Sequence, residues 1–252
     1  MTIKLYNTLT KNVEDLRPLH DNIVSIYSCG PTVYSYAHIG NMRSFLSADV
    51  LQRVCRVVGG YNVRWVMNIT DIDDKTIRDS ALKSEHWLDA MGEQSADSLQ
   101  NLRAFTDFYA ALFIDDISSL GIRRDHLLAM PRATEFIPQM QDLIRRIVER
   151  GVAYVADGSV YFDLRAWRSM AAYGRLFAVD TDNFREGVRI DANEYERDSV
   201  SDFVLWKAQK DGEPAWDFAL SVNGTEWNLR GRPGWHIECS AMGKELLGLP
   251  FD

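Results

Sequence analysis

The stretch Cys29-Gly-Pro-Thr-Val-Tyr-Ser-Tyr-Ala-His-Ile-Gly-Asn-Met-Arg43 decides the fold of this chain through what stands on either side of it. Before it, residues 23–27 (Ile-Val-Ser-Ile-Tyr) form an alternating apolar run that predicts a buried strand. After it, residues 45–58 carry apolar side chains at helical spacing, and residues 63–69 predict a second strand. Strand, glycine-containing loop, helix and strand make a βαβ unit, the nucleotide-binding half of a doubly wound sheet. We therefore expect the stretch to bring free N–H groups of a helix N-terminus beside a thiol and an imidazole.

Two later stretches of the sequence also form recognisable motifs. They are Asn68-Ile-Thr-Asp-Ile-Asp-Asp-Lys75 and Gly231-Arg-Pro-Gly-Trp-His-Ile-Glu-Cys-Ser-Ala-Met242. With them, His38-Ile-Gly-Asn41 resembles the HIGH signature of class I aminoacyl-tRNA synthetases, and the Cys-Gly-Pro-Thr-Val-Tyr before it resembles the cysteinyl branch. The chain is similar to the N-terminal catalytic part of a cysteinyl-tRNA synthetase. This resemblance implies a HIGH-type nucleotidyl transferase fold: a Rossmann-like, doubly wound parallel α/β sheet with an inserted α+β middle region.

Composition excludes several classes of protein. Charged residues at 25% and hydrophobic residues at 46% are ordinary for a globular protein. No apolar run approaches the roughly 20 residues that span a bilayer, and the N-terminus lacks the layout of a signal peptide, so we expect no membrane partner. Three cysteines, odd in number and far apart, argue against a disulfide framework and for a reduced cytoplasm.

The net charge of −8 speaks against a nucleic-acid partner for this segment, because phosphate binding calls for clustered Lys and Arg. The acidic charge is nevertheless compatible with the resemblance, since such synthetases place much of their tRNA contact in C-terminal domains. We therefore expect tRNA(Cys) to bind mainly through regions outside these residues.

The rest of the chain predicts alternating helical and extended segments. We expect residues 1–115 to form the first half of the catalytic domain, residues 116–199 an inserted connective region, and residues 200–252 a second catalytic part that shares one sheet with the first. The predicted elements are a strand at 3–6, mostly helix over 74–120, a helix at 133–150, a hairpin of 152–155 and 159–162, an irregular segment at 165–197, a strand at 203–207, a loop with an optional hairpin at 214–228, and a helix at 235–247.

Residues at the start of the first helix are candidates for binding nucleotide. The resemblance assigns His38 and Asn41 to catalysis, and Tyr34 and Gly40 with them to the binding of ATP, which enters with Mg²⁺. Asn41 replaces the second His of the signature, so it can donate a hydrogen bond to a phosphate oxygen but cannot become cationic. The alternative is an ordinary strand-to-helix turn without ligand.

Cys29 and Cys239 are the candidate metal ligands. Thiolates suit Zn²⁺, but the spacing of these two residues does not itself indicate a metal, and isolated cysteines are usually small buried hydrophobes. The resemblance implies one zinc ion bound through both, with a later His and Glu that would lie beyond Asp252. His236 and Glu238, beside Cys239, are alternative ligands, and His236 would share a helix face with Cys239. We assign Cys55 to the core.

The same resemblance places Cys29, Gly30, Thr70 and Trp235 around the substrate cysteine. Thr70 would supply a hydroxyl and Trp235 an aromatic wall. The alternatives are that Thr70 only caps a helix and Trp235 only fills the core. The acids of Thr70-Asp-Ile-Asp-Asp74 could form a metal cluster, but we expect at least two of the three to complement a helix N-terminus instead.

The implied reaction is that of a cysteine–tRNA ligase. Cysteine attacks the α-phosphate of ATP to give cysteinyl-adenylate, which is then transferred to tRNA(Cys), with catalysis by positioning and charge stabilisation. No Lys-Met-Ser-Lys-Ser motif occurs in the chain, so we expect a truncated catalytic domain of low intrinsic activity. The resemblance implies a monomer. Two alternatives stay open: a ligase that joins cysteine to an amino sugar, and a non-catalytic nucleotide-binding module derived from a synthetase.

Overall fold

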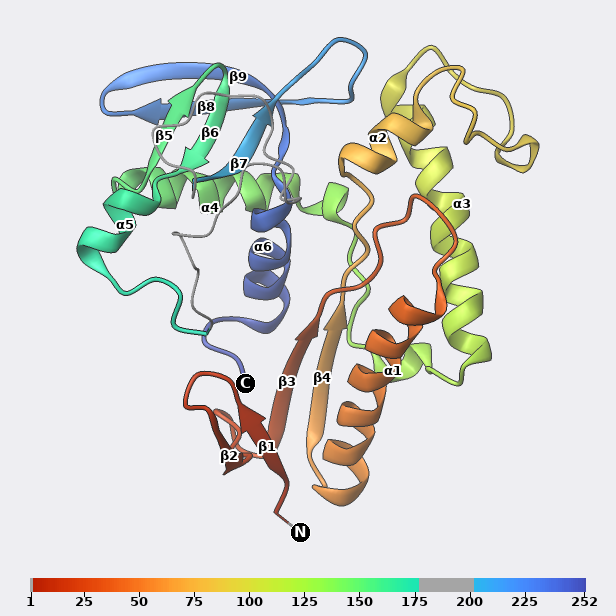
Figure 1. Cartoon of the computed structure of the whole chain (residues 1–252), viewed down its shortest axis with the longest axis vertical. Coiled ribbons are helices and arrows are strands. Elements are labelled where there is room, and N and C mark those ends of the chain that lie inside the picture. The colour runs from red at the N-terminus through yellow and green to blue at the C-terminus, as the bar shows by residue number, and fades with distance from the viewer. Residues whose placement is uncertain (1, 177–201) are drawn as a thin grey trace.

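A parallel pair of strands forms the centre of the lower half of the molecule (Figure 1). The computed structural model describes residues 2–176 and 202–252. Strands β3 (Ile23–Ser28) and β4 (Asn62–Met67) run parallel, with Ile23 opposite Asn62 and Ser28 opposite Met67. Short parallel bridges join Val66 to Ala129 and Ile69 to Arg132, so a third segment continues the sheet beyond β4. The predicted βαβ unit is confirmed in its order and in its parallel pairing.

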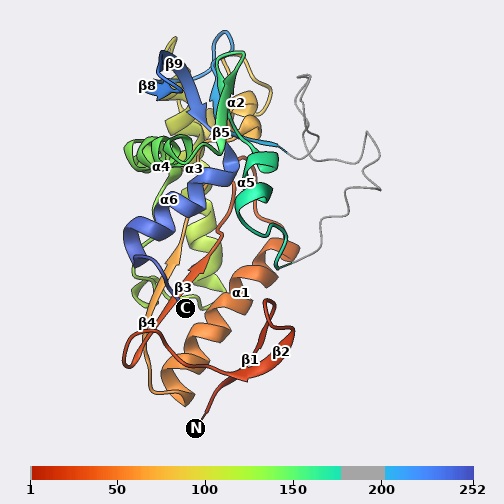
Figure 2. The same ribbon diagram turned by 90° about the vertical axis from the view of Figure 1, so that its left-hand side faces the viewer.

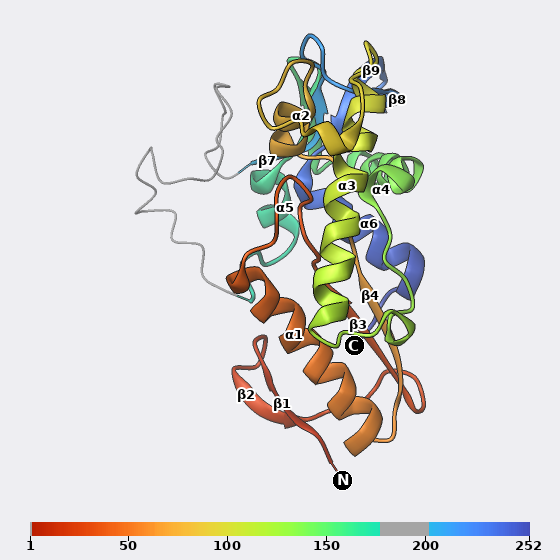
Figure 3. The same cartoon turned by 90° about the vertical axis from the view of Figure 1, so that its right-hand side faces the viewer.

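Helices cover both faces of this pair. Helix α1 (Ile39–Arg53) connects β3 to β4 through a π-helical turn at Val54–Val58, and α3 (Ser98–Ser119) lies beside it (Figure 3). Because side chains alternate along a strand, Val63, Trp65 and Met67 enter the core that α1 and α3 close. Arg64 points the other way and donates to the carbonyl of Leu246 at 2.8 Å, in α6 (Trp235–Leu247). Helix α6 thus lies against the opposite face.

The second sheet has five antiparallel strands in the order β5-β6-β7-β9-β8. Its strands are β5 (Ala153–Ala156), β6 (Ser159–Phe162), β7 (Phe203–Ala208), β8 (Trp216–Val222) and β9 (Thr225–Pro233). The expectation that the strands after residue 200 share a sheet with the first half is wrong among the described strands, since β7 pairs with β6 and β9. Periodicity identifies a strand but does not select its partner, which explains the error.

The hairpin that the sequence analysis gave as an option at 214–228 is present, as strands β8 and β9. They pair from Trp216–Gly231 to Val222–Thr225 and turn at Asn223-Gly224, where both residues have positive φ. Phe218, Leu220 and Val222 are buried at every second position and pack onto α4 (Ile137–Glu149) and α6, which lie under the sheet (Figure 2). The alternation is present in the sequence and begins with the partly buried Trp216, but the apolar Ala219 between Phe218 and Leu220 obscures its period.

The remaining elements are short. They are the hairpin β1 (Lys4–Asn7) with β2 (Asn12–Asp15), helix α2 (Asp74–Ser80), a 3₁₀ turn at Asp89–Met91, and helix α5 (Leu164–Met170). The helix expected over 74–120 is therefore interrupted, and Leu82 and Leu88, between the two helical parts, are exposed. Part of the segment expected to be irregular lies outside the described residues. Within the described part of the chain, no helix combines the length and the apolar character that crossing a bilayer requires.

Candidate active site

The fold brings together two cysteines that are 210 positions apart in the sequence. Cys29 directly follows β3, and Cys239 lies in the first turns of α6; their Sγ atoms are 3.5 Å apart. Both thiols are free. A hydrogen bond from the Cys239 thiol lowers the pKa of Cys29 to about 6, whereas that contact and burial raise the pKa of Cys239. The pair therefore loses its first proton easily and holds the second tightly.

Asn68 connects the segments around these thiols. It is 1% exposed and directly follows β4. Its Oδ1 accepts from the N–H of Gly30 at 3.2 Å and from Sγ of Cys239 at 3.8 Å, and its Nδ2 donates to Oγ1 of Thr70 at 3.1 Å. One amide side chain thus contacts the loop after β3, the loop after β4 and helix α6. The sequence analysis quoted this residue in a motif but gave it no role; a polar residue directly after a buried parallel strand is the signal that could have found it.

Gly30 is required by the close approach of the two loops. A Cβ placed on it would lie 1.7 Å from the carbonyl oxygen of Asn68, so any side chain would separate the backbones. Gly234 has the same role before α6, where a Cβ would lie 2.0 Å from the carbonyl oxygen of Val204. These two glycines bring both thiol-bearing segments close to the strands beside them.

Thr70 does not cap a helix. It is 3% exposed and accepts from Asn68, whereas the N-cap of α2 is Asp73, whose carboxylate accepts from the N–H of Lys75 at 2.7 Å. Asp74 occupies the first turn, so two of the three acids do complement a helix N-terminus, as expected. Asp71 instead accepts from the N–H and Oγ1 of Thr134, and burial raises its pKa. The capping alternative for Thr70 is therefore wrong.

Trp235 and His236 lie at the beginning of α6. Trp235 is 58% exposed, so the alternative that it only fills the core is wrong. The ring of His236 lies 4.7 Å from that of Phe203 and 5.4 Å from that of Trp235. Among the residues that the structure describes, no three His, Cys, Asp or Glu side chains form a group that could hold a metal ion, and His236 does not lie in such a group with the two cysteines. Cys55 is fully buried in the core, as expected.

The signature residues form the N-terminus of α1. His38 is the N-cap: its Nδ1 accepts from the N–H of Gly40 at 3.0 Å, and its own N–H donates to Oδ1 of Asn41 at 3.3 Å. Because Nδ1 accepts, the neutral ring carries its proton on Nε2, which leaves a donor free on an exposed side chain. Tyr34 lies nearby in sequence and contacts Lys75, whose Nζ is 4.7 Å from its ring centre.

The segment between β4 and α2, called here the Thr70 loop, ends at a charged junction at the start of α2. Lys207 and Arg232 stand opposite each other on β7 and β9, are 6% and 3% exposed, and both donate to Oδ1 of Asp74. The Lys207 contact is 2.7 Å long. Burial raises the pKa of Asp74, but the charges of Arg232 and Lys207 outweigh it and hold that pKa below its ordinary value. This junction was not found in the sequence, because nothing in the spacing of the three residues indicates contact.

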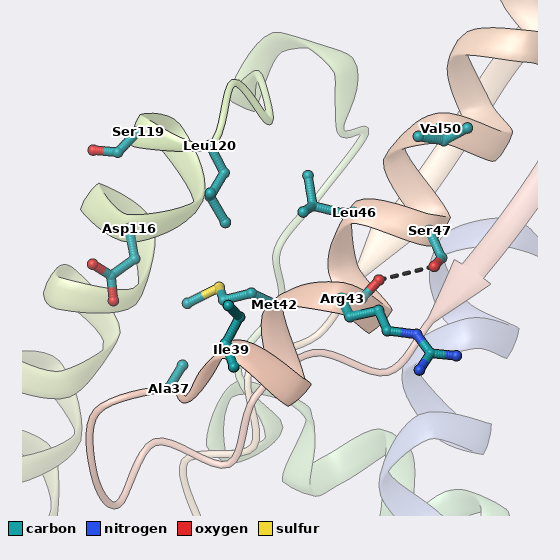
Figure 4. A pocket seen from close by; sticks show the side chains of 10 residues that line it. All are labelled: Ala37, Ile39, Met42, Arg43, Leu46, Ser47, Val50, Asp116, Ser119 and Leu120. Atoms are coloured by element: carbon teal, nitrogen blue, oxygen red, sulfur yellow. Dashed lines mark hydrogen bonds between the residues drawn. The ribbon is translucent and has the colours of Figure 1, made fainter.

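A hollow of about 820 Å³ lies away from these residues, between α1 and the end of α3 (Figure 4). Ile39, Met42 and Leu46 of α1 and Leu120 after α3 line it, with Arg43 and Asp116 at its edges. None of the predicted site residues lines it. It is an apolar groove on the outer surface of α1.

The two thiols fit half of a zinc site. Two thiolates bound to one tetrahedral Zn²⁺ stand about 3.8 Å apart, close to the separation of the sulfurs here. The exposed position of Cys29 leaves room for further ligands on one side of the pair. Cys29 and Cys239 would therefore supply two of the four ligands.

The chain combines a parallel βαβ unit, a His-x-Gly motif where its helix begins, and the motif of residues 231–242 at the start of α6. This combination is that of the catalytic domain of a class I tRNA synthetase. The comparison with known families agrees. Residues 15–252 match the family described as the class I tRNA synthetase (C) catalytic domain, and the chain belongs to this family.

The similar curated proteins named below are both described as cysteine–tRNA ligases. A cysteine–tRNA ligase from Leptospira interrogans (serogroup Icterohaemorrhagiae, serovar Lai) is 41% identical over 99% of this chain and 47% of its own length. One from Roseobacter denitrificans is 42% identical over 100% of this chain and 50% of its own. The chain thus spans about half the length of the curated relatives it matches. A crystal structure assigned as an arginyl tRNA synthetase from Campylobacter jejuni covers 91% of the chain with a TM-score of 0.50 at 11% identity, which supports the fold alone.

Proposed function

We propose that the chain carries the cysteine-activating site of a cysteine–tRNA ligase. The observation that carries this proposal is the 3.5 Å contact between the thiols of Cys29 and Cys239, at the carboxyl end of a parallel strand and beside a helix that begins at His38. In an open parallel sheet, ligands bind at the carboxyl ends of the strands. The names of the curated relatives support this activity.

The N-terminus of α1 would bind the phosphates of ATP. The helix dipole favours negative charge there, and Gly40, which has no side chain, would let the phosphates approach the backbone. Its own N–H already donates to Nδ1 of His38. His38 would donate from Nε2 and Asn41 from its amide, since Oδ1 of Asn41 is already engaged with the His38 N–H. Tyr34, held by Lys75, would border the nucleotide, and Mg²⁺ would accompany the phosphates. These groups stabilise charge that develops when the cysteine carboxylate attacks the α-phosphate.

The substrate cysteine would lie between Gly30, Thr70 and Trp235. Asn68 donates from Nδ2 to Oγ1 of Thr70, so the hydroxyl of Thr70 keeps its own proton, which would be donated to the substrate in place of the neighbouring Glu238 carboxyl. Trp235 exposes an aromatic face for the same space. When bound by Cys29 and Cys239, Zn²⁺ would select sulfur over a hydroxyl or a methyl group, because soft thiolates are its preferred ligands.

The finer fold and the domain division belong to the same proposal. Helices on both faces of the parallel strands β3 and β4 support a doubly wound Rossmann-type sheet. The N–H of Ser25 on β3 donates to Oδ2 of Asp252 at 2.9 Å. We infer the division into catalytic residues 1–115, inserted residues 116–199 and catalytic residues 200–252, in an enzyme that acts as a cytoplasmic monomer.

The acceptor would be tRNA(Cys). The relatives named above are tRNA ligases, which favours this acceptor over an amino sugar. A direct comparison of tRNA with a glucosamine-inositol as acceptor of the activated cysteine would distinguish the two.

The test uses a stable mimic of the first product. We expect the purified chain to bind cysteinyl-sulfamoyl-adenosine about 100-fold more tightly than its seryl counterpart by isothermal titration calorimetry, because only the former presents a thiol. The Cys55→Ser variant should behave as the wild type, and Cys239→Ser should lose the preference. Equal affinity for both mimics would contradict the proposed specificity.

A further inference from the structure

The two thiols of the site lie close enough to react with each other. The 3.5 Å between their Sγ atoms must shorten by about 1.5 Å to reach the bond length of a disulfide. Rotation of two side chains supplies most of such a movement. Cys29 follows a strand and Cys239 lies in a helix, so neither backbone has to unfold.

The surroundings hold the pair together without metal. Asn68 accepts both from Sγ of Cys239 and from the N–H of Gly30, the residue next to Cys29. Asn68 is 1% exposed, so its own position is fixed by the core. The sulfurs therefore face each other as a property of the fold.

The cysteines differ in access to solvent. Cys29 is exposed, Cys239 is partly buried, and Cys55 is fully buried. A small oxidant in solution reaches Cys29 first, and Cys239 is the only other described thiol in contact with it. Cys55 provides an unreactive thiol within the same chain.

We propose that Cys29 and Cys239 form a redox modification site, which hydrogen peroxide converts into an intramolecular disulfide. The sulfur of Cys29 attacks one oxygen of the peroxide, the O–O bond breaks, and a sulfenic acid and water form. The sulfur of Cys239 then attacks the Cys29 sulfur and expels a second water. Two thiols thus give two electrons and two protons to one peroxide.

Closure of the disulfide would remove both sulfurs from the proposed binding of zinc. This consequence rests on the proposed function, whereas the disulfide itself rests only on the geometry of the pair. Reduction by a dithiol reverses the change, because it restores both thiols.

The experiment treats the reduced, chelator-washed chain with an equimolar amount of hydrogen peroxide and follows intact mass and alkylation of thiols after denaturation. We expect a loss of about 2 Da, a single remaining thiol at Cys55, and a cross-linked peptide pair containing Cys29 and Cys239. Cys55→Ser should react like the wild type. Cys239→Ser should instead gain oxygen at Cys29, because no partner resolves its sulfenic acid.

Oxygen addition at Cys29 in the wild type, without the cross-link, would overturn the inference, and so would disulfides formed only between chains. A parallel sample with excess Zn²⁺ separates this inference from the proposed function. Unchanged disulfide formation in that sample would support the redox site and contradict the zinc site; slowing by about tenfold or more would support both.

Discussion

Two junctions join the parallel sheet to the layer that contains α6, and they differ in chemistry. At Asn68, neutral hydrogen bonds connect Gly30, Thr70 and Cys239. At Asp74, one carboxylate meets two buried cations, Lys207 and Arg232. Both junctions fix the position of the Thr70 loop, one at each of its ends.

The difference shows which part of the site can tolerate charge. The Asn68 junction contacts the Cys239 thiol directly, and a fixed charge there would perturb the protonation of the thiol pair. The Asp74 junction lies at the other end of the Thr70 loop, so its ionic contacts do not touch the thiols. We infer that Asp74 mainly stabilises the fold, whereas Asn68 also sets the geometry of the thiol pair.

The largest effect is expected from Gly30→Ala, which separates the two loops at the Asn68 junction. The new Cβ would lie 1.7 Å from a backbone oxygen, so the free energy of unfolding should fall by about 4 kcal/mol or more. In the control Gly40→Ala, the new Cβ meets only the ring of His38, which can move, and urea unfolding should change by at most about 1 kcal/mol. Equal losses in the two variants would contradict the close-approach role of Gly30.

The next effect is expected from Asp74→Asn, which leaves the buried Lys207 without its anion and Arg232 with only the longer contact to Glu213 at 3.7 Å. The loss should be about 3 kcal/mol at pH 7. In Asp217→Asn, which breaks an exposed ion pair with Arg230 in the same sheet, urea unfolding should change by less than about 0.5 kcal/mol. Similar losses in both variants would show that burial does not strengthen the Asp74 junction.

The pH dependence of the Asp74 effect follows from the direction of its pKa shift. The carboxyl pKa is lowered in the folded chain, so its contribution is present above the ordinary pKa of an aspartate and is lost as the pH falls through the lowered value. The difference in unfolding free energy between wild type and Asp74→Asn should therefore shrink below about pH 4. A difference that grows on acidification would contradict the ionic nature of this junction.

Asn68→Ala should cost about 2 kcal/mol, because it removes three contacts of a buried amide. Asn101→Ala is a matched control, because Asn101 is also buried, at 3% exposed, and makes two hydrogen bonds with the backbone of Ser95. Asn101 lies far from both cysteines in the sequence. Both variants should lose stability, but only Asn68→Ala should slow disulfide formation between Cys29 and Cys239. Equal rates of disulfide formation in the two variants would show that Asn68 does not position the thiol pair.

The smallest effect is expected from Thr70→Val, which keeps the shape of the side chain and removes one acceptor. Stability should fall by about 1 kcal/mol, since a single buried hydrogen bond to Asn68 is lost. Affinity for cysteinyl-sulfamoyl-adenosine should fall as well, by about tenfold, if the hydroxyl binds the substrate. Unchanged affinity would assign Thr70 to the fold alone.

Much of the local structure could be predicted from the sequence. The alternation in β3 and the helical period in α4 and α6 are local, so they are visible without knowledge of any partner. The pairing of β7 with β6 could not be predicted, because strands of either sheet show similar patterns. The hairpin β8–β9 was expected only as an option, because the apolar Ala219 between Phe218 and Leu220 obscures the alternation along β8.

The candidate site was predictable only in part. The joint role of Cys29 and Cys239 came from the resemblance to a known family, since nothing in their spacing brings them together. The structure places them in contact, and the zinc that they would bind stays a prediction. Asn68 and Asp74 were missed because their roles depend on contacts between distant segments, which composition and periodicity do not contain.

The most direct test of the central claim, that Cys29 and Cys239 form one site, is a Zn²⁺ titration of the reduced, metal-free chain and its three single Cys→Ser variants. We expect the wild type and Cys55→Ser to bind a single Zn²⁺, and Cys29→Ser and Cys239→Ser each to bind it at least about tenfold more weakly. Equal affinity in all four proteins, or no binding by the wild type, would contradict the claim.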